Sequence, residues 1–413
     1  MNLVFNKWDN NENPIPNLSE LNSSEYYVTF PFFFEDINFN IKSCRLKDIN
    51  KNETFYFIIS YRWSYTFYIK NGEIFLPKEI EEYIKNFDLK VIFLSETESN
   101  KFSDVFLNLL IKKIKKNNWK EENFFIIDNN SKLHKTKDKF KTNVNIFKIN
   151  HLITFFSKKN NPPSVNDIIL DKKFIFLCQN RQPHYHRVLL LTYLKHLNLF
   201  ENDITNWSLT MSHSDYMKYT QQSSNVLSLL HFKNYLDLNN TQLIKDYSYM
   251  CNITQLCYYL EDLDWKNTVN NFNHYDITNT IENSLNYQNS YINIVTESHY
   301  HYRDNSVHIT EKSFKPFYFF QLPIFLASWE HIKMMREEYD LDFFDDLIDH
   351  SYDNEKDDAK RMHMVINEIK RLSNMREEIF EFYKNNVDIL IKNHNLIKNN
   401  NYKEIFKQYL LDI

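Results

Sequence analysis

The stretch INIVTESHYHYRDNSVHITEKSFKPFYFFQLPIFLAS, residues 292–328, decides the fold that we predict for this chain. Its apolar beginning, residues 292–295, is typical of a buried strand. Thr310 is a suitable N-cap, so we expect a helix to begin there. Residues 322–326 predict a second strand, in which a proline is acceptable near the start. Strand, helix and strand form a βαβ unit, which places anionic ligands at the carboxyl edge of a parallel sheet.

Glu311 and Lys312 give the start of this helix a specific chemistry. A helix N-terminus supplies N–H groups and a partial positive charge, and Lys312 adds a full positive charge. The carboxylate of Glu311 is able to accept two hydrogen bonds from the vicinal diol of a ribose. Together the two residues favour a nucleotide that has both a ribose and a diphosphate. A capped, solvated helix start with an incidental Glu–Lys pair is the alternative interpretation.

Residues 310–316, TEKSFKP, and residues 321–325, QLPIF, resemble the donor-binding signature of α1,3-fucosyltransferase-like glycosyltransferases. The same arrangement occurs in glycosyltransferase-like proteins of bacteria and large DNA viruses. The resemblance extends over residues 172–350. It implies a GT-B fold, in which two Rossmann-like domains face each other across a cleft. It also implies transfer of a sugar from a nucleotide-sugar to a hydroxyl acceptor.

The resemblance assigns roles to residues around this helix start. It implies that Glu311 holds the ribose of the donor and that Lys312 holds the diphosphate. Thr310 and Glu297 complete the predicted donor site. The family has a small residue or a glycine after the proline-containing strand, where this chain has Ala-Ser at residues 327–328. The base and the sugar of the donor therefore stay open.

The composition is that of a globular protein with room for two domains: 413 residues, 43% hydrophobic and 25% charged. A net charge of −5 argues against a large nucleic-acid surface. Gly72 is the one glycine, which excludes GxGxxG, Walker and GxSxG motifs. A phosphate site must therefore use a helix N-terminus and basic side chains. Turns with positive φ must use Asn or Asp.

The cysteines and the apolar runs indicate the compartment. Neither CxxC zinc spacing nor a disulfide framework is indicated by Cys44, Cys178, Cys251 and Cys257. No apolar run approaches the roughly 18 residues of a membrane span, and the first residues turn polar too early for a signal peptide. We therefore expect a cytoplasmic, reduced protein without a membrane anchor, in the host cytoplasm if the protein is viral.

Residues 1–160 predict a Rossmann-like domain, which the resemblance makes the acceptor domain. Apolar runs typical of buried parallel strands alternate there with amphipathic helical runs. The predicted strands are residues 2–5, 55–59, 91–94 and 124–127, and the clearest helix is residues 103–118.

An inverting transfer needs a base that takes the proton of the acceptor hydroxyl. Glu96 and Glu98 follow the strand at 91–94, and residues just beyond strand ends face the ligand crevice of a parallel sheet. The resembling family has a Glu base in its N-terminal domain, which implies Glu96 or Glu98 as the catalytic base. A solvated loop carboxylate is the alternative for each. His299 or His301 is a further candidate for the base.

Residues 157–164 predict a linker, because they are polar and contain paired prolines. The donor domain, residues 166–352, then opens with a buried strand at 173–178 and a helix at 184–199. This order of elements predicts a second α/β domain.

Arg181 and Arg187 lie at the turn after that strand and in the first helical turns. Arginine suits a diphosphate because its planar fork donates two parallel hydrogen bonds. In the resembling family, arginines at this place contribute to the donor diphosphate, and surface arginines are the alternative. His184 and His186 are two residues apart on the helix and do not face one site, so we expect no metal there.

Residues 353–413 predict C-terminal helices, with charged amphipathic stretches at 355–374 and 377–413. As in two-domain glycosyltransferases, the last stretch is expected to pack back on the first domain, and a helical extension or an oligomer contact is the alternative. Two Asp-x-Asp sequences, at 262–264 and 340–342, are interpreted as solvated turns rather than metal sites.

We therefore predict an α/β protein of two Rossmann-like domains with C-terminal helices. Its predicted function is an inverting, metal-independent glycosyl transfer from a nucleotide-sugar to a hydroxyl acceptor, a glycan rather than DNA. Lys312, Arg181 and Arg187 would balance the charge of the leaving group in place of Mg²⁺. We expect no metal and no cofactor.

Two other function classes stay open. A sugar transferase for hydroxylated bases of viral DNA would use the same fold, with lysine-rich residues 112–116 and 132–141 along a DNA groove. A non-catalytic module would keep the fold to bind a nucleotide or a glycan. Salt-dependent binding to duplex DNA identifies the first class. Hydrolysis of the donor without an acceptor argues against the non-catalytic module.

Overall fold

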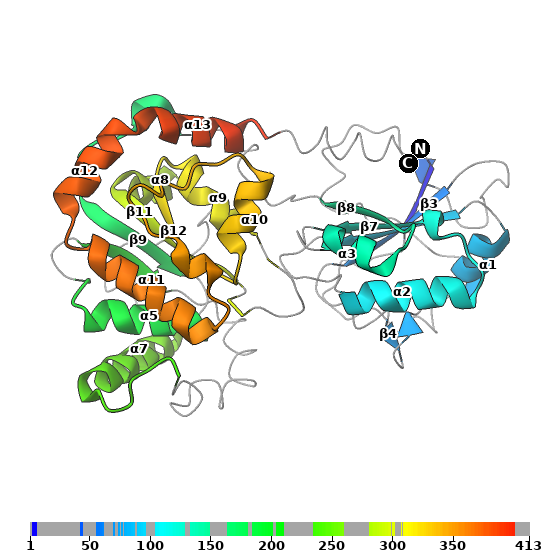
Figure 1. The fold of residues 1–413 in the computed structure, drawn as a ribbon, viewed down its shortest axis with the longest axis horizontal. Helices are drawn as coiled ribbons and strands as arrows, with labels where there is room; N and C mark the ends of the chain where they lie inside the picture. The colour runs from blue at the N-terminus through cyan, green and yellow to red at the C-terminus, as the bar shows by residue number, and fades with distance from the viewer. Residues whose placement is uncertain are drawn as a thin grey trace. The chain divides into compact units, whose positions relative to one another are not determined.

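The computed structural model describes residues 2–5, 42–43, 55–61, 69–70, 73–74, 76, 78–86, 89–95, 104–128, 133–148, 163–180, 184–200, 204–209, 234–259, 281–298, 300–301, 307 and 309–400. The chain forms two compact units. The first comprises residues 1–152, 303–308 and 401–413, and the second comprises residues 153–302 and 309–400. Each unit contains its own parallel sheet (Figure 1).

The first unit is built on strands β1 (Asn2–Phe5), β2 (Lys42–Ser43), β3 (Phe55–Tyr61), β6 (Leu89–Ser95), β7 (Phe124–Asp128) and β8 (Asn145–Lys148). They pair in parallel, in the order β2-β1-β3-β6-β7-β8. A short antiparallel pair consists of β4 (Ile69–Lys70) and β5 (Glu73–Ile74). The helices are α1 (Lys78–Asn86), α2 (Asp104–Lys116) and α3 (Leu133–Phe140), with a 3-10 turn η3 (Glu121–Asn123).

Four strands of this sheet, β1, β3, β6 and β7, confirm the strands predicted from their apolar runs. The strands β2, β4, β5 and β8 and the helix α3 were not predicted, because each is short and at most half apolar. The lysine-rich sequence at 132–141, interpreted above as a basic cluster, largely forms α3.

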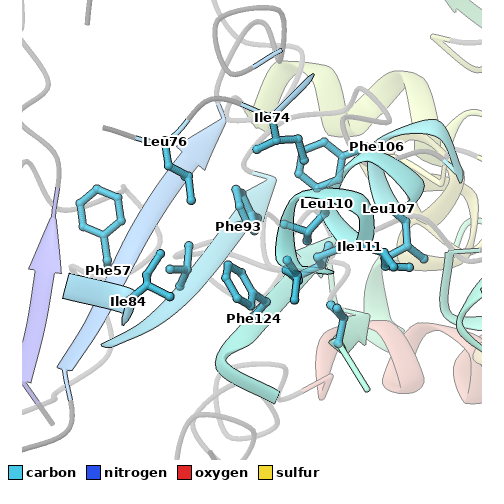
Figure 2. Close-up of a cluster of buried hydrophobic side chains, with 14 of the residues drawn as sticks. Phe57, Ile74, Leu76, Ile84, Phe93, Phe106, Leu107, Leu110, Ile111 and Phe124 are labelled. Carbon is cyan, nitrogen blue, oxygen red and sulfur yellow. The ribbon is translucent and has the colours of Figure 1, made fainter. Parts of the chain in front are cut away.

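The core of the first unit forms between α2 and the sheet (Figure 2). Phe106 of α2 meets Phe93 of β6 edge to face, with ring centroids 5.3 Å apart. Phe124 of β7 belongs to the same buried cluster. The apolar face of α2 recurs at helical spacing and consists of Phe106, Leu107, Leu110, Ile111 and Ile114. Apolar burial therefore holds α2 on the sheet.

We expect Leu110→Ala to lower the free energy of unfolding by about 2–5 kcal/mol, because it leaves a cavity between α2 and the sheet. Val105→Ala on the same helix is the control, because Val105 is 60% exposed. Its effect should stay within about 0.5 kcal/mol. Urea denaturation measures both variants. Equal losses would show that α2 is not packed through this face.

The second unit contains strands β9 (Phe174–Asn180), β10 (Thr205–Leu209), β11 (Ser290–Thr296) and β12 (Leu322–Leu326). They are parallel, in the order β10-β9-β11-β12. The helices are α5 (Tyr185–His196), α7 (Thr241–Tyr259), α8 (Ile281–Gln288), α9 (Glu311–Tyr318), α10 (His331–Glu338), α11 (Asp358–Leu372), α12 (Arg376–Asn385) and α13 (Val387–Lys398). Two 3-10 turns are η5 (Val165–Asp167) and η8 (Ser351–Asn354).

The strand order creates a topological switch point between β9 and β11. From β9 the chain passes through α5 to β10 on one side, and from β11 it passes through α9 to β12 on the other side. Figure 1 shows α9 and α13 on one face of the sheet and α5, α7 and α11 on the opposite face. Ligands of open parallel sheets bind at such a point, at the carboxyl ends of the strands. The predicted α/β class is confirmed for both units.

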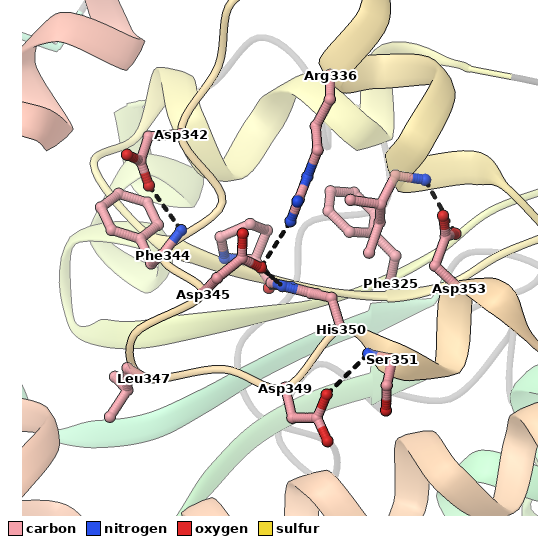
Figure 3. A network of polar contacts seen from close by, with 12 residues as sticks. Phe325, Arg336, Asp342, Phe344, Asp345, Leu347, Asp349, His350, Ser351 and Asp353 are labelled. Atoms are coloured by element: carbon pink, nitrogen blue, oxygen red, sulfur yellow. Dashed lines mark hydrogen bonds and ion pairs between the residues drawn. The ribbon is translucent and has the colours of Figure 1, made fainter.

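The edge strand β12 is covered by residues 345–354 (Figure 3). Nε2 of His350 donates to the carbonyl of Pro323 at 3.1 Å. The backbone N–H of Phe325 donates to the hydroxyl of Tyr352 at 3.0 Å. Side chains thus satisfy these two outward groups of the strand, and an edge covered in this way is protected from pairing with another chain.

Asp353 occupies the N-terminus of α10 (Figure 3). Its carboxylate accepts hydrogen bonds from the backbone N–H groups of Ile332 at 3.0 Å and Lys333 at 2.9 Å. On the same helix, Arg336 forms an ion pair with Asp345 at 2.6 Å. The partial positive charge at the start of α10 is therefore neutralised by a side chain of the protein itself.

Among the described helices, three end in a Schellman motif, in which a residue with positive φ follows the last turn. After α2 and α5 this residue is Asn118 (φ 55°) and Asn198 (φ 57°), as the lack of glycine predicts. After α9 it is Phe320 (φ 54°), and Gln321 N–H closes the motif on the Pro316 carbonyl at 2.8 Å. Lys141, Glu330 and Phe344 also have positive φ. The expectation that only Asn or Asp would serve was therefore wrong.

The predicted C-terminal helix at 377–413 is interrupted at Asn386, which ends α12 and begins α13. Both helices pack on the second unit. The Tyr383 hydroxyl donates to the Phe320 carbonyl at 2.7 Å, and His394 Nδ1 donates to the Tyr318 carbonyl at 2.6 Å. Residues 401–413, the end of the stretch predicted to contact the first domain, lie outside the described residues.

Lys172, just before β9, is a buried lysine. Its Nζ donates to the Gln288 carbonyl at 2.6 Å and lies 4.8 Å from the centre of the Tyr383 ring. Burial lowers its pKa to about 7, from 10.5 for an exposed lysine. Between these two values the unfolded chain binds a proton that the folded chain does not bind. Stability therefore rises with pH across this window and changes little below it.

We expect the stability of the wild type, relative to Lys172→Met, to increase by about 2 kcal/mol between pH 7 and pH 9. The variant lacks the titrating amine, so subtracting its pH profile removes the contribution of every other group. Urea denaturation at pH 7, 8 and 9 gives both profiles. Parallel profiles would contradict the lowered pKa of Lys172.

Candidate functional site

A buried carboxylate joins the end of β11 to the start of α9. Glu297 directly follows β11 and is fully buried. It accepts hydrogen bonds from the N–H of Thr310 at 3.1 Å, from the hydroxyl of Thr310 at 2.8 Å and from the Ser313 hydroxyl. Nε2 of His331 donates to the Ser313 hydroxyl at 2.8 Å. The network fixes the start of α9 at the carboxyl edge of the second sheet.

Thr310 is the N-cap of α9, as predicted. Its hydroxyl accepts from the backbone N–H of Lys312 at 3.2 Å. Glu297 and Thr310 therefore bind two of the N–H groups at this helix start, and the helix dipole remains directed at the sheet edge.

Lys312 brings a positive charge to this edge. Its Nζ lies 3.2 Å from the Ser298 hydroxyl, 3.4 Å from the Thr310 hydroxyl and 3.2 Å from Oε1 of Glu311. The side chain is 24% exposed, so solvent and ligands are able to reach it. Two of these partners are neutral hydroxyls, which bind an ammonium more weakly than an anionic oxygen does.

Glu311 has an oxygen whose hydrogen-bonding capacity is not used. Oε1 pairs with Lys312, whereas Oε2 is buried and has no hydrogen-bond partner. The side chain is 12% exposed. Two other side chains at this edge also carry buried atoms without hydrogen-bond partners, Gln179 in β9 and Ser328 after β12. A buried polar atom without a partner costs about 1–3 kcal/mol, which a ligand that supplies the partner recovers.

Arg187 and His186 extend from α5 to the end of β11. Arg187 is buried and donates to the Thr296 carbonyl at 3.1 Å. His186 is buried and donates through Nε2 to the Glu297 carbonyl at 2.9 Å. Burial lowers the pKa of His186 well below its usual value, so its ring is neutral. Contact of Arg187 with a diphosphate stays a prediction.

The predicted site residues fall into three groups, one of which is the base candidate His301, a described residue hydrogen-bonded to Asp358. The structure brings five of them together at the switch point of the second sheet. Four others, the base candidates Glu96, Glu98 and His299 and the donor candidate Arg181, lie outside the described residues. The five that meet are Arg187, Glu297, Thr310, Glu311 and Lys312. Glu297 acts on α9 through buried hydrogen bonds, and its contact with a donor stays a prediction.

Arg361 on α11 organises the same edge and was missed by sequence reasoning. It is buried, and it donates to the carbonyls of Ala327 at 3.0 Å, Tyr300 at 3.0 Å and Glu355 at 2.8 Å. It therefore connects the segments that follow β11 and β12 to the start of α11. Its sequence neighbourhood is a charged amphipathic helix, in which a buried arginine gives no distinctive signal.

The Asp-x-Asp sequences and a surface cavity give less support for a functional site. Asp340 pairs with Lys392 at 3.2 Å and Asp342 accepts from the N–H of Phe344 at 2.7 Å, so this Asp-x-Asp forms a turn. The one at 262–264 lies outside the described residues. Among the residues that the structure describes, no group of three His, Cys, Asp or Glu is placed to hold a metal ion. A surface cavity of about 620 Å³ over α10 is not lined by the predicted donor residues.

No described helix combines the length and the apolarity that crossing a bilayer requires. Comparison with known proteins adds no relative, since no family matches the chain and no curated protein matches it in sequence. The residues at the switch point of the second sheet are therefore the basis of the proposed function.

We expect Glu297→Gln to lower the free energy of unfolding by about 1.5–3 kcal/mol, because an amide nitrogen cannot accept from Thr310. The control is Glu378→Gln, an exposed carboxylate in the first turn of α12, with an expected effect within about 0.5 kcal/mol. Urea denaturation compares the two variants. Equal effects would contradict the role of the buried carboxylate.

Proposed function

We propose that this chain is a glycosyltransferase that binds a nucleotide-sugar at the carboxyl edge of the second sheet and transfers the sugar to a hydroxyl acceptor. One observation carries the proposal. At the topological switch point, the start of α9 presents Lys312 beside Glu311, whose Oε2 is buried without a hydrogen-bond partner. The switch point is where open parallel sheets bind nucleotides.

The diphosphate of the donor binds Lys312. Nζ now contacts the hydroxyls of Ser298 and Thr310, and phosphate oxygens replace them as charge-assisted acceptors. The dipole of α9 and the charge of Arg187, which is held at the Thr296 carbonyl, add to the positive potential. Glu297 lies beneath the helix start, and its negative charge offsets part of this positive potential. Lys312 therefore contributes most of the positive potential where the ligand binds.

The ribose binds Glu311. A vicinal diol offers two O–H donors, and a carboxylate with one oxygen paired to Lys312 has room for them on Oε2. The bound diol removes the cost of leaving that oxygen without a partner. This requirement favours a nucleotide over inorganic phosphate or a simple sugar phosphate.

Catalysis in this proposal depends on stabilising the leaving group. As the bond between the anomeric carbon and the diphosphate breaks, negative charge grows on the diphosphate oxygens. Lys312, Arg187 and the start of α9 stabilise that charge, which is the work that Mg²⁺ performs in metal-dependent transferases. The reaction inverts the anomeric configuration when a single base activates the acceptor.

The first unit supplies the acceptor side in the proposed GT-B arrangement. Support comes from its sheet: when its strands are counted in their own chain order, the sheet begins 2-1-3-4, as the sheet of the second unit does. Both sheets thus have a switch point between their first and third strands. The acceptor is a glycan or another hydroxyl-bearing molecule.

We expect one class among UDP-, GDP-, CMP- and dTDP-sugars to raise the melting temperature, and EDTA to leave the shift unchanged. Ligand at a hundred times its Kd stabilises by about 2.7 kcal/mol. The double variant Glu311→Ala/Lys312→Ala should lose the shift. Lys333→Ala should keep it, because Lys333 lies at the start of α10, which Asp353 already occupies.

Absence of a shift with every nucleotide-sugar would contradict the donor site, and a shift abolished by EDTA would contradict metal independence. Release of the free nucleotide from the bound donor distinguishes an enzyme from a binding module. Binding to duplex DNA that weakens steeply with salt would identify DNA as the acceptor.

A further inference from the structure

His301 lies at the same edge of the second sheet as the proposed donor site. It is three residues beyond Ser298, whose hydroxyl contacts Lys312. Three residues span at most about 11 Å, which bounds the distance between the Cα atoms of Ser298 and His301. The imidazole is 33% exposed, so a substrate is able to reach it.

A carboxylate orients this imidazole. Nδ1 of His301 is hydrogen-bonded to Asp358, the first residue of α11, and the other oxygen of Asp358 accepts from Arg361 at 2.5 Å. Burial alone would raise the pKa of Asp358, but the hydrogen bonds from His301 and Arg361 lower it below its usual value. The ionised Asp358 accepts the Nδ1 proton, which leaves the lone pair of His301 on Nε2.

That lone pair already accepts a hydrogen bond from a hydroxyl. The phenol of Tyr185, the first residue of α5, is hydrogen-bonded to Nε2 of His301. Burial raises the pKa of Tyr185 above its usual value, so the phenol keeps its proton and donates it. A hydroxyl that donates to Nε2 is the arrangement in which an imidazole acts as a general base on an alcohol.

The imidazole is held on a rigid frame. Arg361 donates to the carbonyls of Tyr300 and Ala327, both at 3.0 Å, which fixes the segment after β11 to the segment after β12. The Tyr300 ring stacks on His186 at 5.4 Å, and its hydroxyl is bonded to the backbone carbonyl of Asp358. Tight support of this kind is what a catalytic side chain requires.

We propose that His301 is the general base of the transfer, that Asp358 positions it, and that the Tyr185 hydroxyl occupies the place of the acceptor hydroxyl when no acceptor is bound. The inference rests on the proposed function. It places the base in the second unit, beside the donor, instead of at Glu96 or Glu98.

In the proposed transfer, one bond to the anomeric carbon forms while another breaks. Nε2 of His301 takes the proton of the acceptor hydroxyl while the hydroxyl oxygen forms its bond to the anomeric carbon. The bond from that carbon to the diphosphate oxygen breaks, and the nucleoside diphosphate leaves with the electron pair. The groups that contact His301 are Tyr185 from α5, Tyr300, and Asp358 from α11. Beyond them, His186 stacks on Tyr300, Tyr235 meets Tyr185 edge to face, and Arg361 is bonded to Asp358.

A second His–Asp pair in the unit serves as a matched control. His196 Nδ1 donates to Asp246 at 3.0 Å, and Nε2 accepts from the Asn240 amide at 3.3 Å. His196 is the last residue of α5, about 17 Å from Tyr185 along the helix. It therefore lies towards the opposite edge of the sheet from Lys312.

The experiment measures release of nucleoside diphosphate by the full chain from UDP-glucose, GDP-fucose and dTDP-glucose, with water as acceptor. We expect His301→Ala to lower kcat by about 10²–10⁴-fold and to keep the donor-induced shift in melting temperature. Added imidazole should restore part of the rate. His196→Ala should behave as wild type. In Asp358→Asn, kcat should fall and the acidic limb of its pH profile should shift.

Other outcomes would contradict the assigned base, the glycosyl transfer or the role of Asp358. A His301→Ala rate near that of the wild type, or a loss that imidazole does not restore, overturns the assignment of the base and leaves the donor site intact. A wild type that binds no nucleotide-sugar or releases no nucleoside diphosphate overturns glycosyl transfer and the base together. An unchanged pH profile in Asp358→Asn overturns the positioning role of Asp358.

Discussion

The buried charge of Glu297 is the constraint on which the second unit depends. A carboxylate without access to water needs hydrogen-bond donors, and Glu297 obtains them from Thr310 and Ser313. These donors are available only when the start of α9 lies against the end of β11. The positions of Glu311 and Lys312 follow, because both are carried on the first turn of that helix.

Arg361 performs the complementary task with the opposite charge. Its guanidinium donates to backbone carbonyls of the segments after β11, after β12 and before α11. Glu297 thus fixes the position of the helix start, and Arg361 fixes the positions of the loops around it. Because each would leave uncompensated groups if displaced, the carboxyl edge is defined before any ligand binds.

Local sequence was sufficient to predict the elements that depend on apolar periodicity or on helix capping. The strands at β9, β11 and β12 and the cap at Thr310 were predicted because apolar runs and an N-cap are visible within a few residues. The interruption at Asn386 was missed because apolar positions continue on both sides of it. The contact of Arg361 with the Tyr300 carbonyl and the pairing of His301 with Asp358 join residues about sixty positions apart, and no local pattern reports such contacts.

The Schellman turn after α9 couples the backbone conformation of one residue to the packing of its side chain. A glycine there would relieve backbone strain of about 1–2 kcal/mol but would contribute no side chain to the core. Phe320 instead accepts that strain, and its buried ring stacks on His394 of α13 at 4.4 Å. In a chain with a single glycine, a residue that shapes a turn therefore also builds the core. Evolution of such a sequence is constrained accordingly, since backbone and packing at Phe320 must change together.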